Sequence, residues 1–352
     1  MPSLDVTLDA ATLTAALCDI ESVSGSEATL ADAIEIALRS AAHLTVDRDG
    51  DALIARTSLG HPERVVIAGH IDTVPIADNL PCRLDDGRIH GCGTTDMKSG
   101  VAVALRLAVS LPEPNRDVTW VFYDNEEVEA FRNGLGRITT NHPDWLAGEF
   151  AVLMEPTSAN VEGGCQGTMR ADVTLRGRRA HSARSWKGDN AIHAAAPVLD
   201  RLRSYRAEEV EIDGLVYREG LSAVGIRGGV AGNIIPDECV ISLNYRFAPN
   251  RSEADAEAVV RAVLDGFDVV VSDSAPGAVP GLSNPAAAAF VEAIGKEPLP
   301  KFGWTDVARF SAVGVPAVNY GPGDPNVAHT REEYVDVALI EECEARLRSW
   351  LT

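Results

Sequence analysis

Cysteine is sparse in this sequence of 352 residues, and the six that occur are scattered along it. The absence of any Cys-x-x-Cys pair argues against a cysteine-type zinc site and against a disulfide framework, so a cytoplasmic setting is expected. Long apolar runs are missing as well. No stretch approaches the roughly 18 residues that span a membrane, and the first residues lack the pattern of a secretory signal.

Basic residues are also in the minority. Lys and Arg together number 31 against 52 Asp and Glu, which gives a formal net charge of −21. Nucleic acid and anionic membranes are poor partners for such a surface, and we expect neither. The hydrophobic fraction of 45% is ordinary for a globular protein. The length suits about two domains.

Three short apolar runs have the pattern of buried strands, and they lie at 64–69, 118–123 and 150–154. A helical pattern over 98–111 separates the first two runs. Strand, helix and strand in this order predict an α/β domain, with a parallel or mixed sheet flanked by helices.

A different pattern begins near residue 169. Strand-like and helix-like segments follow one another in a β-α-β-β-α-β-like order, which predicts a small α+β unit packed separately. The strands are expected at 170–175, 221–227 and 238–247, and the helices at 191–204 and 252–264. We therefore expect a discontinuous larger domain of residues 1–168 and 278–352, with residues 169–277 inserted into it.

Residues suited to binding a metal follow each of the three strands of the larger domain. They are His70 and Asp72 after the first strand, Glu126 and Glu127 after the second, Glu155 after the third, and Asp96 before the intervening helix. Each has an ordinary explanation when taken alone, such as a solvated loop or, for Asp96, a helix N-cap. Together they favour a functional site, because sites in open α/β sheets form at the carboxyl ends of strands.

The residue types suit hydrolysis with a pair of metal ions. Zinc accepts imidazole nitrogen and carboxylate oxygen without needing thiolate. A metal pair needs a bridging carboxylate and a bridging water or hydroxide, whose pKa the metals lower. A glutamate that is not a ligand can take the proton of that water and pass it to the leaving amine. Glu126 and Glu127 can divide these tasks, and Asp72 is close enough to support His70.

These motifs, together with Gly93-x-x-Asp96-Met97-Lys98, Glu155-Pro156-Thr157 and Ala328-His329-Thr330, resemble the M20 family of metallopeptidases and amidohydrolases. The resemblance implies a zinc-peptidase-like catalytic domain that binds two Zn²⁺ per subunit, with Co²⁺ as a possible substitute. It implies His70 and Glu155 as ligands of one ion, Glu127 and His329 as ligands of the other, and Asp96 as the bridge. Glu126 would be the general acid/base, and Asp72 the support of His70.

The inserted unit resembles the lid and dimerisation domain of the same family. Its segment 179–184 resembles the family's histidine motif, which implies that His181 stabilises the oxyanion in the partner subunit of a homodimer. The segment 228–236, with Asn233, resembles a substrate-contacting loop, and Arg246 resembles a carboxylate-binding arginine. We also expect Arg184 and Thr305 to contact the substrate.

Within the family, segments 123–130, 181–186 and 302–310 resemble the actinobacterial succinyl-diaminopimelate desuccinylases. This implies a small acyl amino-acid substrate, N-succinyl-LL-2,6-diaminopimelate, and a place in lysine biosynthesis. One departure is Gln166, in a segment where proteobacterial desuccinylases carry an arginine pair. Acetylornithine deacetylase and aminoacylase activities therefore stay open. A serine hydrolase is disfavoured because Gly-x-Ser-x-Gly is absent. A non-enzymatic binding protein would be expected to lose Glu126 or a ligand.

Overall fold

The computed structural model describes residues 4–352, and the chain forms two compact units. The first contains Met1–Gly163, Pro280–Leu299 and Thr305–Thr352, and the second contains Gly164–Val279 and Pro300–Trp304. The limits differ by a few residues from those expected at 168 and 278. The brief return of the chain to the second unit at Pro300–Trp304 was not predicted. No helix in the described part of the chain is long and apolar enough to cross a membrane.

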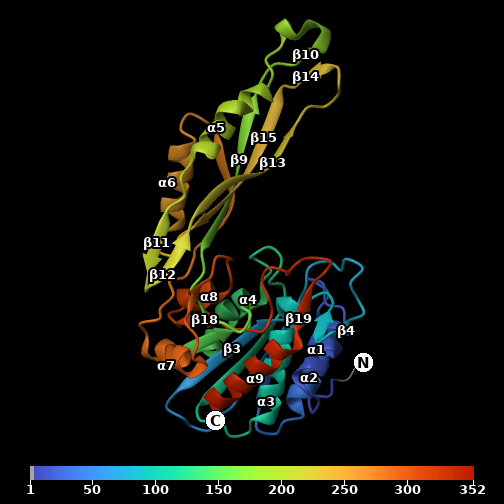
Figure 1. The fold of residues 1–352 in the computed structure, drawn as a ribbon, viewed down its shortest axis with the longest axis vertical. Coiled ribbons are helices and arrows are strands. Elements are labelled where there is room, and N and C mark those ends of the chain that lie inside the picture. Colours follow the sequence, from blue (N-terminus) through green and yellow to red (C-terminus); the bar gives the residue numbers. More distant parts are fainter. Residues whose placement is uncertain (1–3) are drawn as a thin grey trace. The chain divides into compact units, whose positions relative to one another are not determined.

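A mixed eight-stranded sheet forms the centre of the first unit (Figure 1). Strands β6, β3, β7 and β18 run parallel, whereas β1, β2 and β8 pair antiparallel at the two sides. In sheet order the strands are β1 (Thr45–Asp49), β2 (Ala52–Arg56), β6 (Asp117–Tyr123), β3 (Arg64–His70), β7 (Phe150–Leu153), β18 (Ala317–Asn319), β8 (Glu162–Gly163) and β17 (Leu299–Pro300). The mixed α/β fold predicted from the sequence is thus confirmed.

Successive residues of the central strands point to opposite faces of the sheet, and helices cover both faces. Val65 and Ile67 of β3 belong to one apolar core with five helices, whereas Val66 and Ala68 are equally buried but outside that core. The five helices are α1 (Ala10–Cys18), α2 (Ala28–Arg39), α3 (Ser99–Ser110), α7 (Pro285–Ile294) and α9 (Val337–Leu351). The short helices α4 (Gly134–Asn141) and α8 (Val307–Ala312) pack on each other, and α8 packs on β7 and β18. Burial on both faces explains the continuous apolar runs of β3 and β6.

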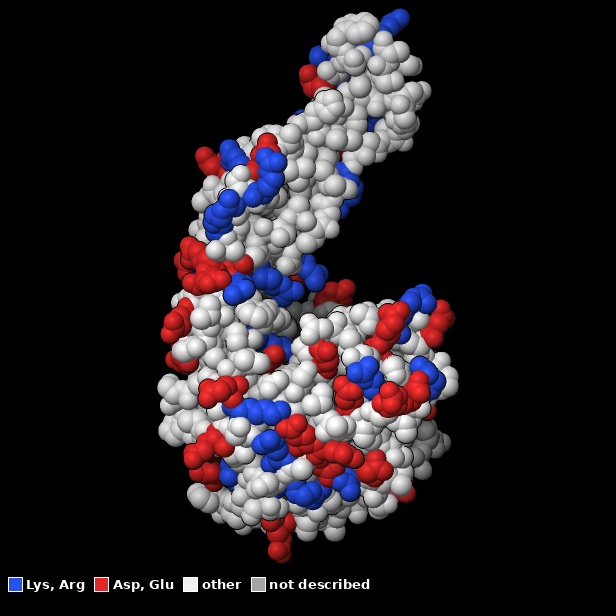
Figure 2. Space-filling view, viewed as in Figure 1, with Lys and Arg blue, Asp and Glu red and all other residues white. Residues whose placement is uncertain are grey.

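A small sheet of β4 (Arg83–Asp85), β5 (Arg88–His90) and β19 (Tyr334–Asp336) completes the first unit. Its pairing of β19 with β5 brings the C-terminal part of the chain beside the segment that leads into α3. Over the visible face of this unit, acidic and basic side chains are interspersed (Figure 2).

The second unit is built on a four-stranded antiparallel sheet with one face covered by helices (Figure 1). Met169, Ala171 and Val173 point into the core under these helices, and the residues between them lie on the other face. In sheet order the strands are β13 (Gly220–Gly228), β15 (Glu238–Phe247), β9 (Gly167–Arg176) and β16 (Val269–Ala275), and the helices are α5 (Ala196–Ser204) and α6 (Glu253–Val263). The β-α-β-β-α-β order matches the predicted one. The hairpin of β11 (Glu209–Ile212) and β12 (Leu215–Arg218) is an addition that the sequence did not reveal.

Candidate metal centre

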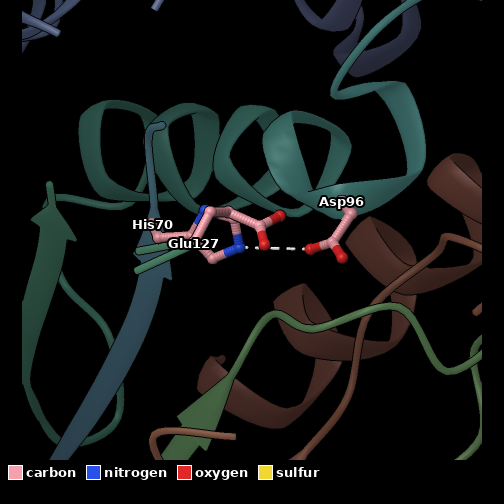
Figure 3. A group of neighbouring side chains, drawn as sticks. All are labelled: His70, Asp96 and Glu127. Carbon is pink, nitrogen blue, oxygen red and sulfur yellow. Dashed lines mark hydrogen bonds and ion pairs between the residues drawn. The ribbon is translucent and has the colours of Figure 1, made fainter. Parts of the chain in front are cut away.

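Three of the expected metal ligands meet at the carboxyl end of the central sheet. His70 ends β3, Glu127 follows β6, and Asp96 lies in a helical turn, η1 (Thr94–Lys98), that leads into α3. One ligand atom from each lies within 4.8 Å of the others. His70 and Asp96 point toward each other, with Nε2 of the histidine 3.1 Å from Oδ1 of the aspartate (Figure 3).

His329 reaches the same cluster from the C-terminal part of the chain. Its Nε2 atom lies 2.8 Å from Oε1 of Glu127 and 3.3 Å from Oδ2 of Asp96. The two carboxylate oxygens of Asp96 therefore face two different histidines, His70 on one side and His329 on the other. This is the arrangement that a bridging carboxylate needs.

Glu155 lies just past the end of β7 and is buried, with 5% of its surface exposed. It does not belong to the three-residue group around Asp96, but its charge reaches Glu126 and Tyr123. Helix α3 can approach this strand end closely because residue 100 is glycine. A Cβ atom on Gly100 would lie 2.3 Å from the backbone oxygen of Met154.

The buried carboxylate of Asp72 accepts hydrogen bonds from several residues around the cluster. Its Oδ1 atom accepts a hydrogen bond from the backbone N–H of Glu126 at 3.0 Å, and its Oδ2 atom accepts one from that of Glu127 at 3.1 Å. The Ser24 hydroxyl donates to Oδ2 at 2.7 Å, and His70 Nδ1 lies 3.4 Å from Oδ1. Asp72 thus positions both glutamates as well as the histidine for which it was expected. The contact of Ser24 was not predicted from the sequence.

The ring orientation of His70 is fixed from behind. Nδ1 lies 3.1 Å from the backbone oxygen of Asp72, which can only accept, so Nδ1 carries the proton. Neutral His70 therefore presents the lone pair of Nε2 to the cluster. Partners of this kind orient histidine ligands in metal sites.

The electrostatics of the cluster favour a cation. Burial alone would lower the pKa of His70, but Asp72 and Asp96 raise it well above its usual value. Hydrogen bonds to the carboxylates of Asp96 and Glu127, together with their negative charges, raise the pKa of His329 to about 11. Burial would raise the pKa of Asp96, but His329 and His70 hold it below its ordinary value. The carboxylates outnumber the histidines here, so the donor set suits divalent cations that accept nitrogen and oxygen.

Glu126 has the properties of a proton carrier. Burial raises its pKa well above the usual value for glutamate, His70 opposes that shift, and the carboxylates of Asp306, Glu155 and Glu127 add to it. A carboxyl group with a raised pKa can both accept and return a proton near neutral pH. Asp306 is fully buried and was not among the expected site residues.

The possibility that Asp96 is a helix N-cap is wrong. Helix α3 begins at Ser99 with Lys98 at the N-cap position, and Asp96 has non-helical dihedrals (φ −121°, ψ 95°). The Asp96–Met97 peptide bond is cis. The side chain of Asp96 is directed at the histidines instead of at the helix N-terminus.

In the second unit, two expected substrate-binding segments lie side by side. The short strands β10 (Ala180–His181) and β14 (Ile234–Ile235) pair, and the N–H of Ser182 donates to the backbone oxygen of Asn233 at 2.9 Å. Nδ1 of His181 accepts a hydrogen bond from the N–H of Ala183 at 3.0 Å. Neutral His181 therefore carries its proton on Nε2, which makes that exposed atom a donor. Arg184 is exposed in the following helical turn, η3 (Ser182–Lys187).

Arg246 lies on β15, on the face of the sheet not covered by helices. Arg246 is half-buried, and it forms no ion pair with any of the described residues, 4–352. Burial lowers its pKa, and the neighbouring positive charge of Arg170 adds to that effect. An arginine in this setting is suited to an anionic ligand that brings its own charge.

Three other arginines of the second unit are paired with acidic residues, namely Arg176 with Glu238, Arg178 with Asp189 and Arg179 with Asp237. They add little to the local positive potential. Thr305 has only 3% of its surface exposed, and its hydroxyl donates to Asn319 at 2.9 Å.

Comparisons with known proteins agree on a family. Residues 66–352 match the model of peptidase family M20/M25/M40. A succinyl-diaminopimelate desuccinylase from Corynebacterium glutamicum is 49% identical over 362 residues, covering 100% of this chain and 98% of the relative. A Mycobacterium tuberculosis protein, provisionally named as the same enzyme, is 56% identical over 351 residues and 99% of both chains. Among solved structures, a Staphylococcus aureus tripeptidase shares the fold with a TM-score of 0.79 at 20% identity, over 99% of this chain and 98% of that one.

Proposed function

Because the chain belongs to peptidase family M20/M25/M40, we propose that it hydrolyses N-succinyl-LL-2,6-diaminopimelate to succinate and LL-2,6-diaminopimelate. The observation that carries this proposal is its full-length similarity, at 49% identity, to the desuccinylase of Corynebacterium glutamicum. The similarity spans both units, and therefore the segments that carry the proposed catalytic and substrate-binding residues. The product would serve lysine biosynthesis.

The proposed cofactor is a pair of Zn²⁺ ions, which Co²⁺ could replace. His70 and Glu155 would hold one ion, Glu127 and His329 the other, and Asp96 both. The nitrogen and oxygen donor set supports this proposal, as do the two histidines on opposite oxygens of Asp96. When bound, the ions would polarise the amide carbonyl and lower the pKa of a water molecule.

Glu126 is the proposed general acid/base. Its backbone is held by Asp72, and its raised pKa supports a role in carrying a proton. The side chain would take a proton from the attacking water as the new C–O bond forms. It would then give that proton to the amide nitrogen as the C–N bond breaks, so that the amine leaves neutral.

Residues of the second unit would bind the substrate. The guanidinium of Arg246, which forms no ion pair with the described residues, would form a bidentate contact with a substrate carboxylate. Asn233 and Arg184, in the segments joined by β10 and β14 at the other end of the sheet, would contact the substrate as well. His181 would donate from Nε2 to the oxyanion of the tetrahedral intermediate. The hydrogen bond that Ala183 donates to Nδ1 supports this role, since it leaves the proton on Nε2.

We further propose a homodimer in which His181 acts in the active site of the partner subunit. Strand β13 supports an interface, because it is an edge of the four-stranded sheet and exposes Val224 by 67% and Ile226 by 54%. Edge strands of this kind pair readily with another chain. Trp186 in η3, which follows His181, and Val230, which precedes β14, are also exposed apolar side chains. None of the six cysteines forms a disulfide, which supports a cytoplasmic enzyme.

A substrate panel tests the proposal. The purified protein with Zn²⁺ would be given N-succinyl-LL-2,6-diaminopimelate, N-acetylornithine and an N-acyl neutral amino acid, and the released amine would be measured. The highest kcat/KM is expected for the succinyl substrate. A preference for acetylornithine or for the acyl amino acid would leave the metal chemistry in place but reject the proposed substrate.

A further inference from the structure

Glu333 is a buried glutamate in the first unit that neither the expected ligand set nor the proton transfer uses. It lies four residues after His329, and only 2% of its surface is exposed. A buried carboxylate is costly unless hydrogen bonds compensate it. Its partners therefore indicate why it is there.

The carboxylate of Glu333 accepts three backbone hydrogen bonds from the turn that carries Asp96. Oε2 accepts from the N–H of Gly93 at 3.0 Å, and Oε1 accepts from those of Thr95 at 2.9 Å and Asp96 at 3.1 Å. N–H groups at the start of a helical turn lack partners within the turn. Glu333 supplies them from a position 237 residues away from Asp96 in the sequence.

The backbone around Glu333 strengthens this connection. The N–H of Gly91 donates to the backbone oxygen of Glu333 at 3.0 Å, and the Thr95 hydroxyl donates to that of Tyr334. The Glu333 N–H donates to the backbone oxygen of Thr330 at 3.3 Å, within the loop that carries His329. One residue thus connects the segments that carry Asp96 and His329.

We propose that Glu333 is a positioning residue that fixes Asp96 and His329 in register for metal binding. This inference rests on the metal-dependent function proposed above. The side chain of Asp96 is held by the two histidines, and its backbone is held by Glu333. Two acceptor oxygens are needed for the three donors, so a glutamine at this position would place an NH₂ group against one N–H.

The experiment compares the full-length wild type with Glu333→Gln, Glu333→Ala and the control Glu332→Gln. Glu332 is exposed in the same loop, so its variant removes the same charge without touching the turn. Three quantities would be measured: the Zn²⁺ dissociation constants by competition with a chromophoric chelator, the melting temperature without metal, and kcat and KM. Partners that orient metal ligands typically change metal affinity or activity by about 10- to 100-fold when removed.

We expect Glu333→Gln to fold, to bind Zn²⁺ more weakly by about 10- to 100-fold, and to lose kcat with little change in KM. Glu333→Ala should lose more than Glu333→Gln, and Glu332→Gln should match the wild type. A melting temperature that falls while Zn²⁺ affinity stays normal would give Glu333 a purely structural role and overturn the proposal. Failure of Glu333→Gln to fold would do the same. A wild type that binds no Zn²⁺ would instead refute the proposed function, and the inference with it.

Discussion

His329 and Glu127 are separated by 202 positions in the sequence, yet Nε2 of the histidine lies 2.8 Å from Oε1 of the glutamate. Such a contact is possible because β3, β6 and β7 end at the same edge of the sheet, while β19 returns the C-terminal part of the chain beside β5. The two adjacent glutamates thus differ in their surroundings. Glu127 lies against His329, whereas burial and the charges of neighbouring carboxylates raise the pKa of Glu126.

The first prediction concerns that division of roles. Glu126→Gln should retain both metal ions and lose activity by about 10²- to 10⁴-fold, because the positioned proton carrier is removed. Metal content and kcat would be measured side by side. Glu129→Gln, an exposed change in the same loop, is the control and should be active. Near-normal turnover, or loss of a metal ion, would mean that Glu126 and Glu127 have been exchanged in our assignment.

The second prediction concerns the ligands. Glu127→Ala and His329→Ala should each reduce bound zinc below two ions per subunit, because each removes a donor atom from the cluster. Metal content after dialysis would be measured by atomic absorption. Either variant that keeps two tightly bound ions and full activity would remove that residue from the ligand set.

Arg246 provides a third test. Arg246→Lys should lower kcat/KM for acidic acyl substrates more than for neutral ones, since a point charge cannot reproduce the bidentate fork. The control is Arg176→Lys. Arg176 lies on the same face of the sheet but is paired with Glu238, so this change should have little effect on kcat/KM. Equal losses with acidic and neutral substrates would indicate that Arg246 is structural.

Mixing two inactive variants tests the shared active site. Subunits of Glu126→Ala and His181→Ala would be allowed to exchange, with exchange confirmed independently. Random pairing makes half of the dimers mixed, and each mixed dimer has one complete site, so roughly a quarter of all sites should work. If His181 acts within its own subunit, mixing restores nothing.

Asp117 gives a prediction on stability and pH. Its buried carboxylate accepts hydrogen bonds from the N–H groups of Leu59, Gly60 and His61 and from the Thr57 hydroxyl. Burial would raise the pKa of Asp117, but these donors and Arg64 hold it below the usual 3.8. A lowered folded-state pKa stabilises the protein above the unfolded-state pKa, and that stabilisation is lost as the pH falls through the folded-state value.

Asp117→Asn should therefore cost about 2 kcal/mol at pH 7, and the difference from the wild type should shrink below pH 3.8. Urea unfolding at the two pH values measures both quantities. A difference that is independent of pH would show that the carboxylate charge does not contribute.

The sequence predicted the central elements because their signals are local. The apolar run of β3 reflects burial on both faces, and the alternation in β9 and β15 reflects burial on one. The positions of Asp72 and Glu126 at strand ends were visible for the same reason. The hydrogen bonds that Asp72 accepts from the N–H groups of Glu126 and Glu127 could not be predicted, because they depend on the pairing of β3 with β6.

Other features have no local signal. His329 is a lone histidine in a loop, and only family resemblance pointed to it. Asp96 was open to interpretation as an N-cap because Asp before a helix usually is one. Its backbone N–H donates to Glu333, which comes from the other end of the chain. Short strands such as β11 and β12 are stabilised by pairing with each other and leave little pattern in the sequence.

The second unit is closed at its base by the chain itself. Cys165, just after the chain enters, and Ala278, just before it leaves, exchange two backbone hydrogen bonds of 2.9 and 3.0 Å. The insertion therefore starts and finishes at one point, and every proposed metal ligand lies outside it. A lineage could remodel this insertion while keeping the residues proposed to hold the metal ions. Substrate preference, and the proposed contribution of His181, could then change while the metal-binding residues stay the same.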